Sequence, residues 1–111
     1  MAEKNYLKAG RILKKLLERR GIEVHKIVVF GSYAKGKEKK GSDIDIIIVS
    51  KDFENQDIFG RVETTAGIHR ELVEEIMIPV DIMYYSVKEW EKGNSLTINA
   101  AKQEGEIVYS R

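Results

Sequence analysis

The stretch Phe30–Val49, FGSYAKGKEKKGSDIDIIIV, decides the fold, because it joins a glycine-serine pair, a charged loop and an acidic strand. The apolar run before it, VHKIVVF, predicts a strand that ends at Gly31. The run DIDIIIV predicts a second strand, which starts with Asp43 and Asp45. Two acids at the head of an apolar strand are costly unless a cation offsets their charge, so this stretch carries a function as well as a fold.

Asp43 and Asp45 stand two residues apart on the predicted strand, so their carboxylates face the same side, roughly 7 Å apart. Like charges at this spacing repel and raise each other's pKa, and a divalent cation relieves the repulsion. Carboxylate oxygens with open water positions suit Mg²⁺ or Mn²⁺, which commonly bind together with substrate phosphates. The pair therefore predicts a metal site for phosphate chemistry.

The Gly31-Ser32 pair predicts the phosphate-binding half of this site. Gly31 would let a phosphate approach the backbone closely, and the Ser32 hydroxyl is a hydrogen-bond donor. The residues SYAKG predict the start of a helix, whose free N–H groups would face the phosphate. Lys35 lies within one turn of Ser32 and is the best phosphate-contacting candidate, whereas the other lysines of the loop are expected to be solvated.

A third acid, Asp81, stands in the middle of the predicted strand IPVDIMYYS, which begins near Pro79. An ionised side chain there is costly unless it is paired. If this strand lies beside the Asp43 strand, three carboxylates can hold two metals, or two can bind metal while the third activates an attacking hydroxyl. A strand acid paired with an arginine is the alternative.

The remaining sequence predicts four helices and a closing strand. A helix runs from Tyr6 to a stop at Gly21, and a second, long helix runs from Asp57 to Met77. The S-x-x-E pattern at Ser86 predicts a short helix through Trp90, which is expected to be a core or lid residue. SLTINAAKQEG predicts a last helix and EIVYS a closing strand. The apolar stripe of the long helix is expected to consist of Phe59, Val62, Ala66, Val73 and Ile76, with His69 as a partly buried histidine bordering the core.

Length and composition set limits on the class of protein. With 111 residues, the chain is expected to form one domain over residues 1–111. The 19 basic and 18 acidic residues nearly cancel and give no global case for a nucleic-acid or membrane-surface partner. The absence of cysteine excludes disulfides and thiolate metal sites. The apolar runs are too short for a membrane span or a signal peptide, so we expect a cytoplasmic protein.

Gly31-Ser32, followed after ten residues by Asp43-Ile44-Asp45, resembles the signature of the DNA polymerase β-like nucleotidyltransferase superfamily, and of its minimal nucleotidyltransferase branch in particular. The resemblance implies an α/β fold with a mixed sheet of about four strands, helices packed on one face and the metal site on the other, open edge. It implies that Gly31 and Ser32 bind nucleotide phosphates and that Asp43 and Asp45 bind Mg²⁺. Asp81 would be the third carboxylate.

Two further residues take their interpretation from the resemblance. Ser42 matches the serine in the common SDID wording of this family and is a candidate nucleotide-binding residue. Lys35 stands where relatives often have arginine, a difference that keeps the charge but loses the planar fork.

In the minimal branch the usual partner is a helical ribonuclease toxin of the HEPN class. The resemblance thus implies an antitoxin that uses ATP to add AMP to a tyrosine hydroxyl of the toxin. Two alternatives remain open: a binding module that neutralises its partner by contact, and a small-molecule nucleotidyltransferase of the antibiotic-modifying kind. The sequence leaves open the acceptor, the base, the number of metals and the oligomeric state, and the acceptor surface would come from a partner, a second copy or an exposed cleft.

Overall fold

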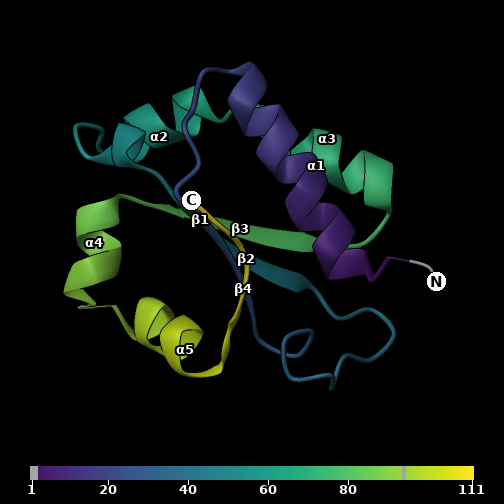
Figure 1. Ribbon diagram of the computed structural model, residues 1–111. Coiled ribbons are helices and arrows are strands. Elements are labelled where there is room, and N and C mark those ends of the chain that lie inside the picture. The colour runs from purple at the N-terminus through teal and green to yellow at the C-terminus, as the bar shows by residue number, and fades with distance from the viewer. Residues whose placement is uncertain (1–2, 94) are drawn as a thin grey trace.

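The computed structural model describes residues 3–93 and 95–111 (Figure 1). The elements in chain order are α1 (Asn5–Arg19), β1 (Lys26–Phe30), β2 (Ile44–Val49), the 3₁₀ helix η1 (Lys51–Phe53), α2 (Ile58–Thr64), α3 (Ile68–Ile76), β3 (Val80–Tyr85), α4 (Val87–Lys92), α5 (Leu96–Glu104) and β4 (Glu106–Ser110). None of the helices in these two ranges is long and apolar enough to cross a membrane.

The four strands form one mixed sheet in the order β3-β2-β1-β4. β1 is antiparallel to both of its neighbours: to β2, which follows it after the charged loop, and to β4, which comes from the far end of the chain. β2 and β3 are parallel, and α2 and α3 form the crossover that parallel strands require. The predicted mixed four-strand sheet is therefore confirmed, and β3 and β4 are its edges.

Helices cover both faces of the sheet (Figure 1). Ile44, Ile46 and Ile48 pack toward α1 and α3, whereas Ile47 and Val49 pack in a second cluster with residues of α4 and α5. The expectation of helices on one face alone was therefore wrong for α4 and α5. The reason is visible in β2 itself, because an uninterrupted apolar run is typical of a strand buried on both sides.

The helix α1 follows the predicted stripe. Its buried positions recur every three or four residues, as expected for a helix with one face on the core. The chain then leaves the helix through Gly21, which has φ of 76° and so takes the left-handed conformation that favours glycine. The buried residues are Tyr6, Ala9, Gly10, Ile12, Leu13 and Leu17.

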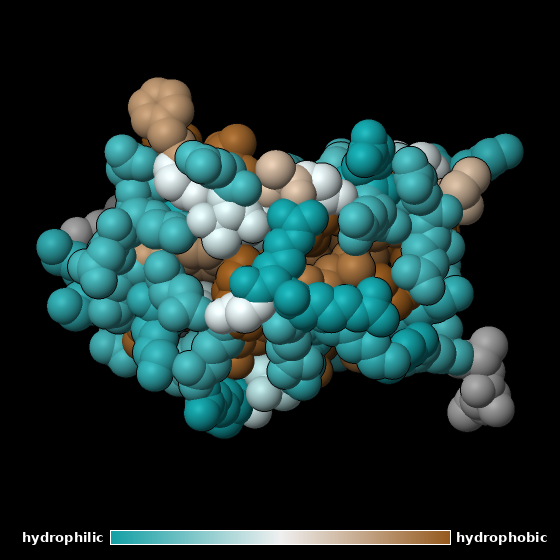
Figure 2. All heavy atoms as spheres, turned by 90° about the horizontal axis from the view of Figure 1, so that it is seen from above, coloured by the Kyte–Doolittle hydropathy of each residue, from teal (hydrophilic) through white to brown (hydrophobic). Residues whose placement is uncertain are grey.

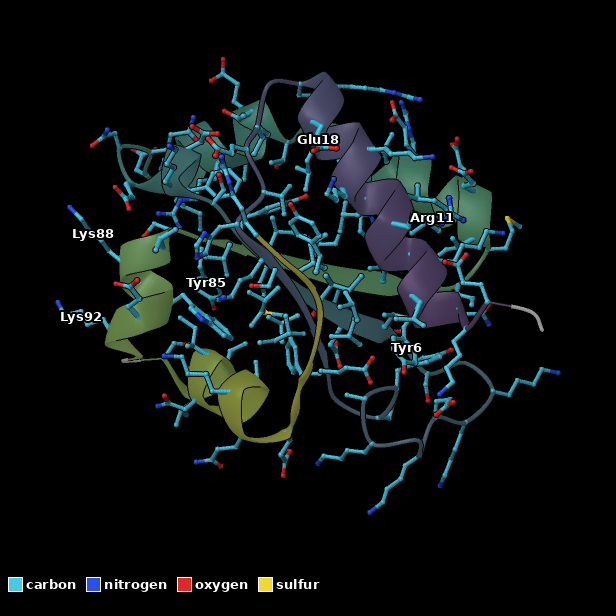
Figure 3. All side chains as sticks on the ribbon, viewed as in Figure 1. Tyr6, Arg11, Glu18, Tyr85, Lys88 and Lys92 are labelled. Atoms are coloured by element: carbon cyan, nitrogen blue, oxygen red, sulfur yellow. The ribbon has the colours of Figure 1, made fainter. Side chains whose placement is uncertain are left out.

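The two short C-terminal helices also begin and end as predicted. Ser86 and Glu89 form a reciprocal capping box at the start of α4, and α5 ends at Gly105. Trp90 is buried, so it is a core residue. Lys88 and Lys92 point away from the body of the protein on the outer side of α4 (Figure 3). α4 is thus an amphipathic helix that covers the second face.

The predicted long helix from Asp57 to Met77 is two helices, α2 and α3, so that prediction was wrong. The break lies where the Thr64 and Thr65 hydroxyls donate to the carbonyls of Gly60 and Arg61, a pattern that weakens helices. Gly67 follows with φ of 86°. The break rotates the apolar stripe: Ile68 and Leu72 are buried, whereas Phe59 and Val62 are exposed.

No residue of α2 is buried, and polar contacts of Arg61 attach this helix to the sheet. Its guanidinium donates to the carbonyls of Phe53 (2.8 Å), Tyr84 (3.1 Å) and, through Nε, Gln56 (3.2 Å). The same group forms an ion pair with Glu89 of α4 at 2.7 Å. One side chain therefore joins α2, η1, the end of β3 and α4.

Arg61→Met is expected to destabilise the protein by about 3 kcal/mol, because it removes the charged donor from three carbonyls and breaks the ion pair with Glu89. The methionine keeps the apolar stem, so packing loss contributes little. Urea denaturation measures the free energy of unfolding, with Arg70→Met as the matched control, since Arg70 is exposed and pairs only loosely with Glu74 at 3.9 Å. Equal stabilities of the two variants would show that Arg61 does not anchor α2.

Candidate active site

The parallel register of β2 and β3 places Asp45 directly beside Asp81. Strand alternation puts both residues on the same face of the sheet as Ile47, Met83 and Tyr85, which is the face of α4 and α5. A three-carboxylate site requires that the Asp81 strand lies beside the Asp43 strand, and this condition is met.

Asp43 precedes β2 by one residue and is exposed, as is Asp81, whereas Asp45 is half-buried. Burial raises the pKa of the Asp45 carboxyl, and the nearby charges of Asp81 and Asp43 raise it further. The predicted repulsion within the acid group is thus present and acts on the most buried member. The three carboxylates make this end of the sheet strongly favourable for a cation.

Gly31 lies against this acid group. Its φ is 75°, and a Cβ at this position would overlap the Asp45 carboxylate. Phe30 pairs with Asp45 across β1 and β2, so the turn begins where the acidic strand begins. The glycine is required here both by its backbone conformation and by the space that the carboxylate occupies.

The segment after Gly31 forms consecutive turns, so the predicted helix start was wrong. Lys37 N donates to the Ser32 carbonyl at 2.9 Å, and Lys35 N donates to the Gly31 carbonyl at 3.3 Å. Gly36 and Gly41 have φ of 68° and 88°, a left-handed conformation that stops a helix from continuing. Any phosphate would therefore meet the N–H groups of a turn and not the end of a helix.

Ser42 and Lys35 already have partners within the protein. The Ser42 hydroxyl accepts from Lys39 N at 2.9 Å and so holds the end of the loop. The Lys35 ammonium pairs with the Glu104 carboxylate at 2.8 Å, which ties the loop to the end of α5. Sequence reasoning missed Glu104, because nothing in the sequence links a helix C-terminus to a loop so far away.

His69 was expected to be a partly buried histidine bordering the core, and it is an exposed residue whose Nε2 is 2.6 Å from the Val80 carbonyl. The ring nitrogen is the donor in this bond. His69 therefore belongs to the outer edge of β3 and not to the acid group.

The donors present fit Mg²⁺ or Mn²⁺ in kind, because three carboxylates occupy neighbouring positions of the sheet and Mg²⁺ and Mn²⁺ prefer oxygen ligands. Among residues 3–93 and 95–111, no three acidic or histidine side chains are already gathered closely enough to hold an ion. The carboxylates would therefore have to turn toward one another to share a cation. A site for one or two metal ions built from Asp43, Asp45 and Asp81 stays a prediction.

Comparison with known proteins gives a consistent result. The nucleotidyltransferase domain family matches residues 10–108. A search of curated proteins finds no match. Among solved structures, the chain is similar to a toxin-antitoxin complex with AMP-PNP, at 21% identity and a TM-score of 0.66, covering 91% of this chain and 73% of that one.

Two further structures share the fold. One is a tri-AMPylated HEPN toxin of Shewanella oneidensis in complex with its MNT antitoxin, at 20% identity and a TM-score of 0.56, covering 97% of this chain and 74% of that one. The other is a minimal nucleotidyltransferase, at 19% identity and a TM-score of 0.57, covering 94% of this chain and 95% of that one. At these identities the likeness shows the fold.

Proposed function

The chain belongs to the nucleotidyltransferase domain family, and from this premise we propose that it transfers AMP from ATP to a hydroxyl group in a reaction that depends on Mg²⁺. The observation that carries the proposal is the register of the sheet. It sets Asp45 beside Asp81 on one face, and the Gly31 turn touches the same carboxylate.

The proposed roles follow from the residue types and from their places at this end of the sheet. Asp43, Asp45 and Asp81 would hold one or two Mg²⁺ ions, for which Mn²⁺ could substitute. The bound metal would supply neutralisation of the negative charge that develops on the phosphates. Gly31 N–H and the Ser32 hydroxyl hold the leaving phosphates. Lys35 is a further nucleotide-binding residue once its ammonium is released from Glu104. Ser42 contributes to nucleotide binding by ordering the loop.

The reaction is a single displacement at phosphorus. The acceptor oxygen forms a bond to the α-phosphorus, and the bond from that phosphorus to the bridging oxygen breaks. Pyrophosphate leaves with the electron pair of the broken bond. The acceptor proton passes to Asp81 or to solvent, and Asp81 is the carboxylate next to the open edge of the sheet.

We infer that the acceptor is a tyrosine of a HEPN-type toxin and that the protein acts as an antitoxin in the cytoplasm. Support comes from the fold, which this chain shares with antitoxins solved together with their toxins.

The test is to incubate the protein with ATP labelled at the α-phosphate, Mg²⁺ and a purified HEPN-type toxin, taken from the neighbouring gene where that gene encodes one. We expect label on a tyrosine of the toxin, located by mass spectrometry, and none when EDTA is present. A correctly folded toxin that stays unlabelled would refute the proposal.

A double variant separates catalysis from neutralisation by contact. Asp43→Ala with Asp45→Ala removes the acid pair and leaves the remaining surface unchanged. If the protein is an enzyme, this variant loses the ability to neutralise the toxin in growing cells. Neutralisation at the level of the wild-type protein would instead identify a binding module.

Glu104→Gln is expected to leave stability within about 0.5 kcal/mol, because the Lys35–Glu104 pair is half-exposed. The change releases the Lys35 ammonium, so the affinity for ATP should rise about threefold if Lys35 contacts phosphate. Isothermal titration calorimetry measures this affinity, with Glu91→Gln, an exposed acid on α4, as the control. An unchanged affinity for ATP would show that Lys35 does not contact the bound phosphates.

A further inference from the structure

The outer edge of β3 is an unpaired strand edge. β3 has only β2 as its neighbour. Ile44 N donates to the Pro79 carbonyl and Ser50 N donates to the Tyr85 carbonyl, both at about 3 Å. These two bonds fix which residues of β3 bond to β2: the N–H and C=O groups of its odd-numbered residues point toward β2. The backbone groups of the even-numbered residues, Val80, Ile82 and Tyr84, therefore point outward.

Side chains close the two ends of this outer edge. His69 occupies the Val80 carbonyl, and Arg61 occupies the Tyr84 carbonyl. Between them, the N–H and C=O of Ile82 and the N–H of Tyr84 form no hydrogen bond within the described part of the chain. Edge strands are commonly protected by charged side chains, prolines or bulges. β3 carries neither a proline nor a bulge, and its charged residue, Asp81, belongs to the acid group.

A groove of about 810 Å³ runs along this edge, in the size range of ligand-binding clefts. Its floor consists of Ile82–Tyr85, and its other wall is α2, including Ile58 and Val62. The outer surface of α2 is apolar, with Ile58, Phe59 and Val62 exposed by 71%, 79% and 64%. Figure 2, which looks onto the face of α1 to α3, shows apolar side chains visible among the hydrophilic ones. Apolar surface beside an open strand edge indicates a protein-binding site.

We propose that this groove binds an extended segment of the partner protein, which adds to the sheet as a strand beside β3 and carries the hydroxyl that accepts AMP. The backbone of the segment would bond to Ile82 and Tyr84, as in other cases of strand addition. This proposal rests on the proposed function, because it names the form in which the acceptor reaches the same site.

The groove and the acid group share the strand β3: the lining of the groove on this strand begins at Ile82, and Asp81 is the preceding residue. Asp81 precedes Ile82, so a residue of the added strand opposite Asp81 would project from the face that carries Asp45. Its Cβ would lie about 5 Å from that of Asp81. The residues on either side would point toward Ile82 and the apolar side chains Ile58 and Val62 of α2. The segment is therefore a tyrosine, serine or threonine flanked by apolar residues.

Amide hydrogen exchange, followed by NMR with the HEPN-type toxin as the probe, tests the docking. We expect the Ile82 and Tyr84 amides to exchange quickly in the free protein and at least tenfold more slowly in the complex. Absence of a complex, or a complex in which both amides exchange as before, would overturn the proposal. Protection that rises with the concentration of the protein alone would also overturn it, because a second copy would then occupy the edge.

Two variants supply an independent readout. Val62→Glu places a charge in the groove, and Ile82→Pro removes an outward N–H that the β2–β3 ladder does not use. Each should lower AMP transfer at least tenfold while ATP binding stays within twofold of the wild-type value. Ile107→Glu is the matched control for Val62→Glu, because Ile107 is 53% exposed on β4 at the opposite edge. Equal rates of AMP transfer by Val62→Glu and Ile107→Glu would show that the groove does not bind the acceptor segment.

The two proposals fail separately. Transfer to the toxin without protection of Ile82 and Tyr84 would retain the proposed function and refute strand addition. Protection without transfer would retain strand addition and refute the proposed function.

Discussion

Gly31→Ala is expected to lower AMP transfer at least 100-fold and to destabilise the protein by about 1–3 kcal/mol. The new Cβ would overlap the Asp45 carboxylate, and the backbone at φ of 75° is unfavourable for alanine. Relief of the overlap must displace either the turn or the carboxylate, and both belong to the candidate site. Steady-state kinetics with α-labelled ATP and urea denaturation measure the two effects.

Gly36→Ala is the matched control, because it separates the backbone cost from the overlap. Gly36 has φ of 68°, and nothing lies within 4 Å of the position that its Cβ would take. The control should therefore lose about 1–2 kcal/mol of stability but keep transfer within a few-fold of the wild-type rate. Equal losses of transfer in the two variants would show that contact between Gly31 and Asp45 is unimportant for the site.

Asp45→Asn is expected to lower transfer about 1,000-fold and, in metal-free buffer at pH 7, to make the folded protein more stable. The asparagine removes a half-buried charge that Asp81 and Asp43 repel. Mg²⁺ should raise the melting temperature of the wild-type protein, because it binds the folded state, and leave that of the variant unchanged. Glu38→Gln, at an exposed acid in the nearby loop, is the control. It should change neither the rate of AMP transfer nor the melting temperature, with or without Mg²⁺.

The same change has a predictable pH dependence. Because the pKa of Asp45 is raised in the folded protein from its usual 3.8, the folded state binds this proton more tightly than the unfolded chain does. The contribution of Asp45 to stability therefore falls as the pH rises from 3.8 through the raised pKa. The stability advantage of Asp45→Asn should be absent in more acidic buffer and complete above the raised pKa. An advantage that is independent of pH would contradict this account.

Much of the fold could be predicted because its signals are local. The capping box at Ser86, the stop at Gly105 and the stripe of α1 depend on residues within a few positions of each other, and the structure confirms them. The break at Thr65–Gly67 was missed because an apolar repeat of helical period continues across it. Only the threonine hydroxyls and the conformation of Gly67 reveal that the chain turns there.

The candidate site likewise has features that local sequence predicts and features that depend on contacts between distant segments. The Gly-Ser turn and the acid pair could be identified from spacing, and the position of Asp81 depended on one condition that the sheet register meets. The Lys35–Glu104 pair and the anchoring role of Arg61 depend on contacts between distant segments. Opposite charges are so common in this chain that their sequence alone does not select the pairs that meet.

Asp45 and Asp81 are separated along the chain by the whole crossover of α2 and α3, and β3 is joined to the sheet through β2 alone. Detachment of β3 would break one ladder and leave β1, β2 and β4 paired, so it requires less free energy than global unfolding. A molecule in that partly open form would retain most of its sheet and lose its third carboxylate. The lifetime of the assembled candidate site would therefore depend on the local stability of one peripheral strand, and a strand bound beside β3 would lengthen it.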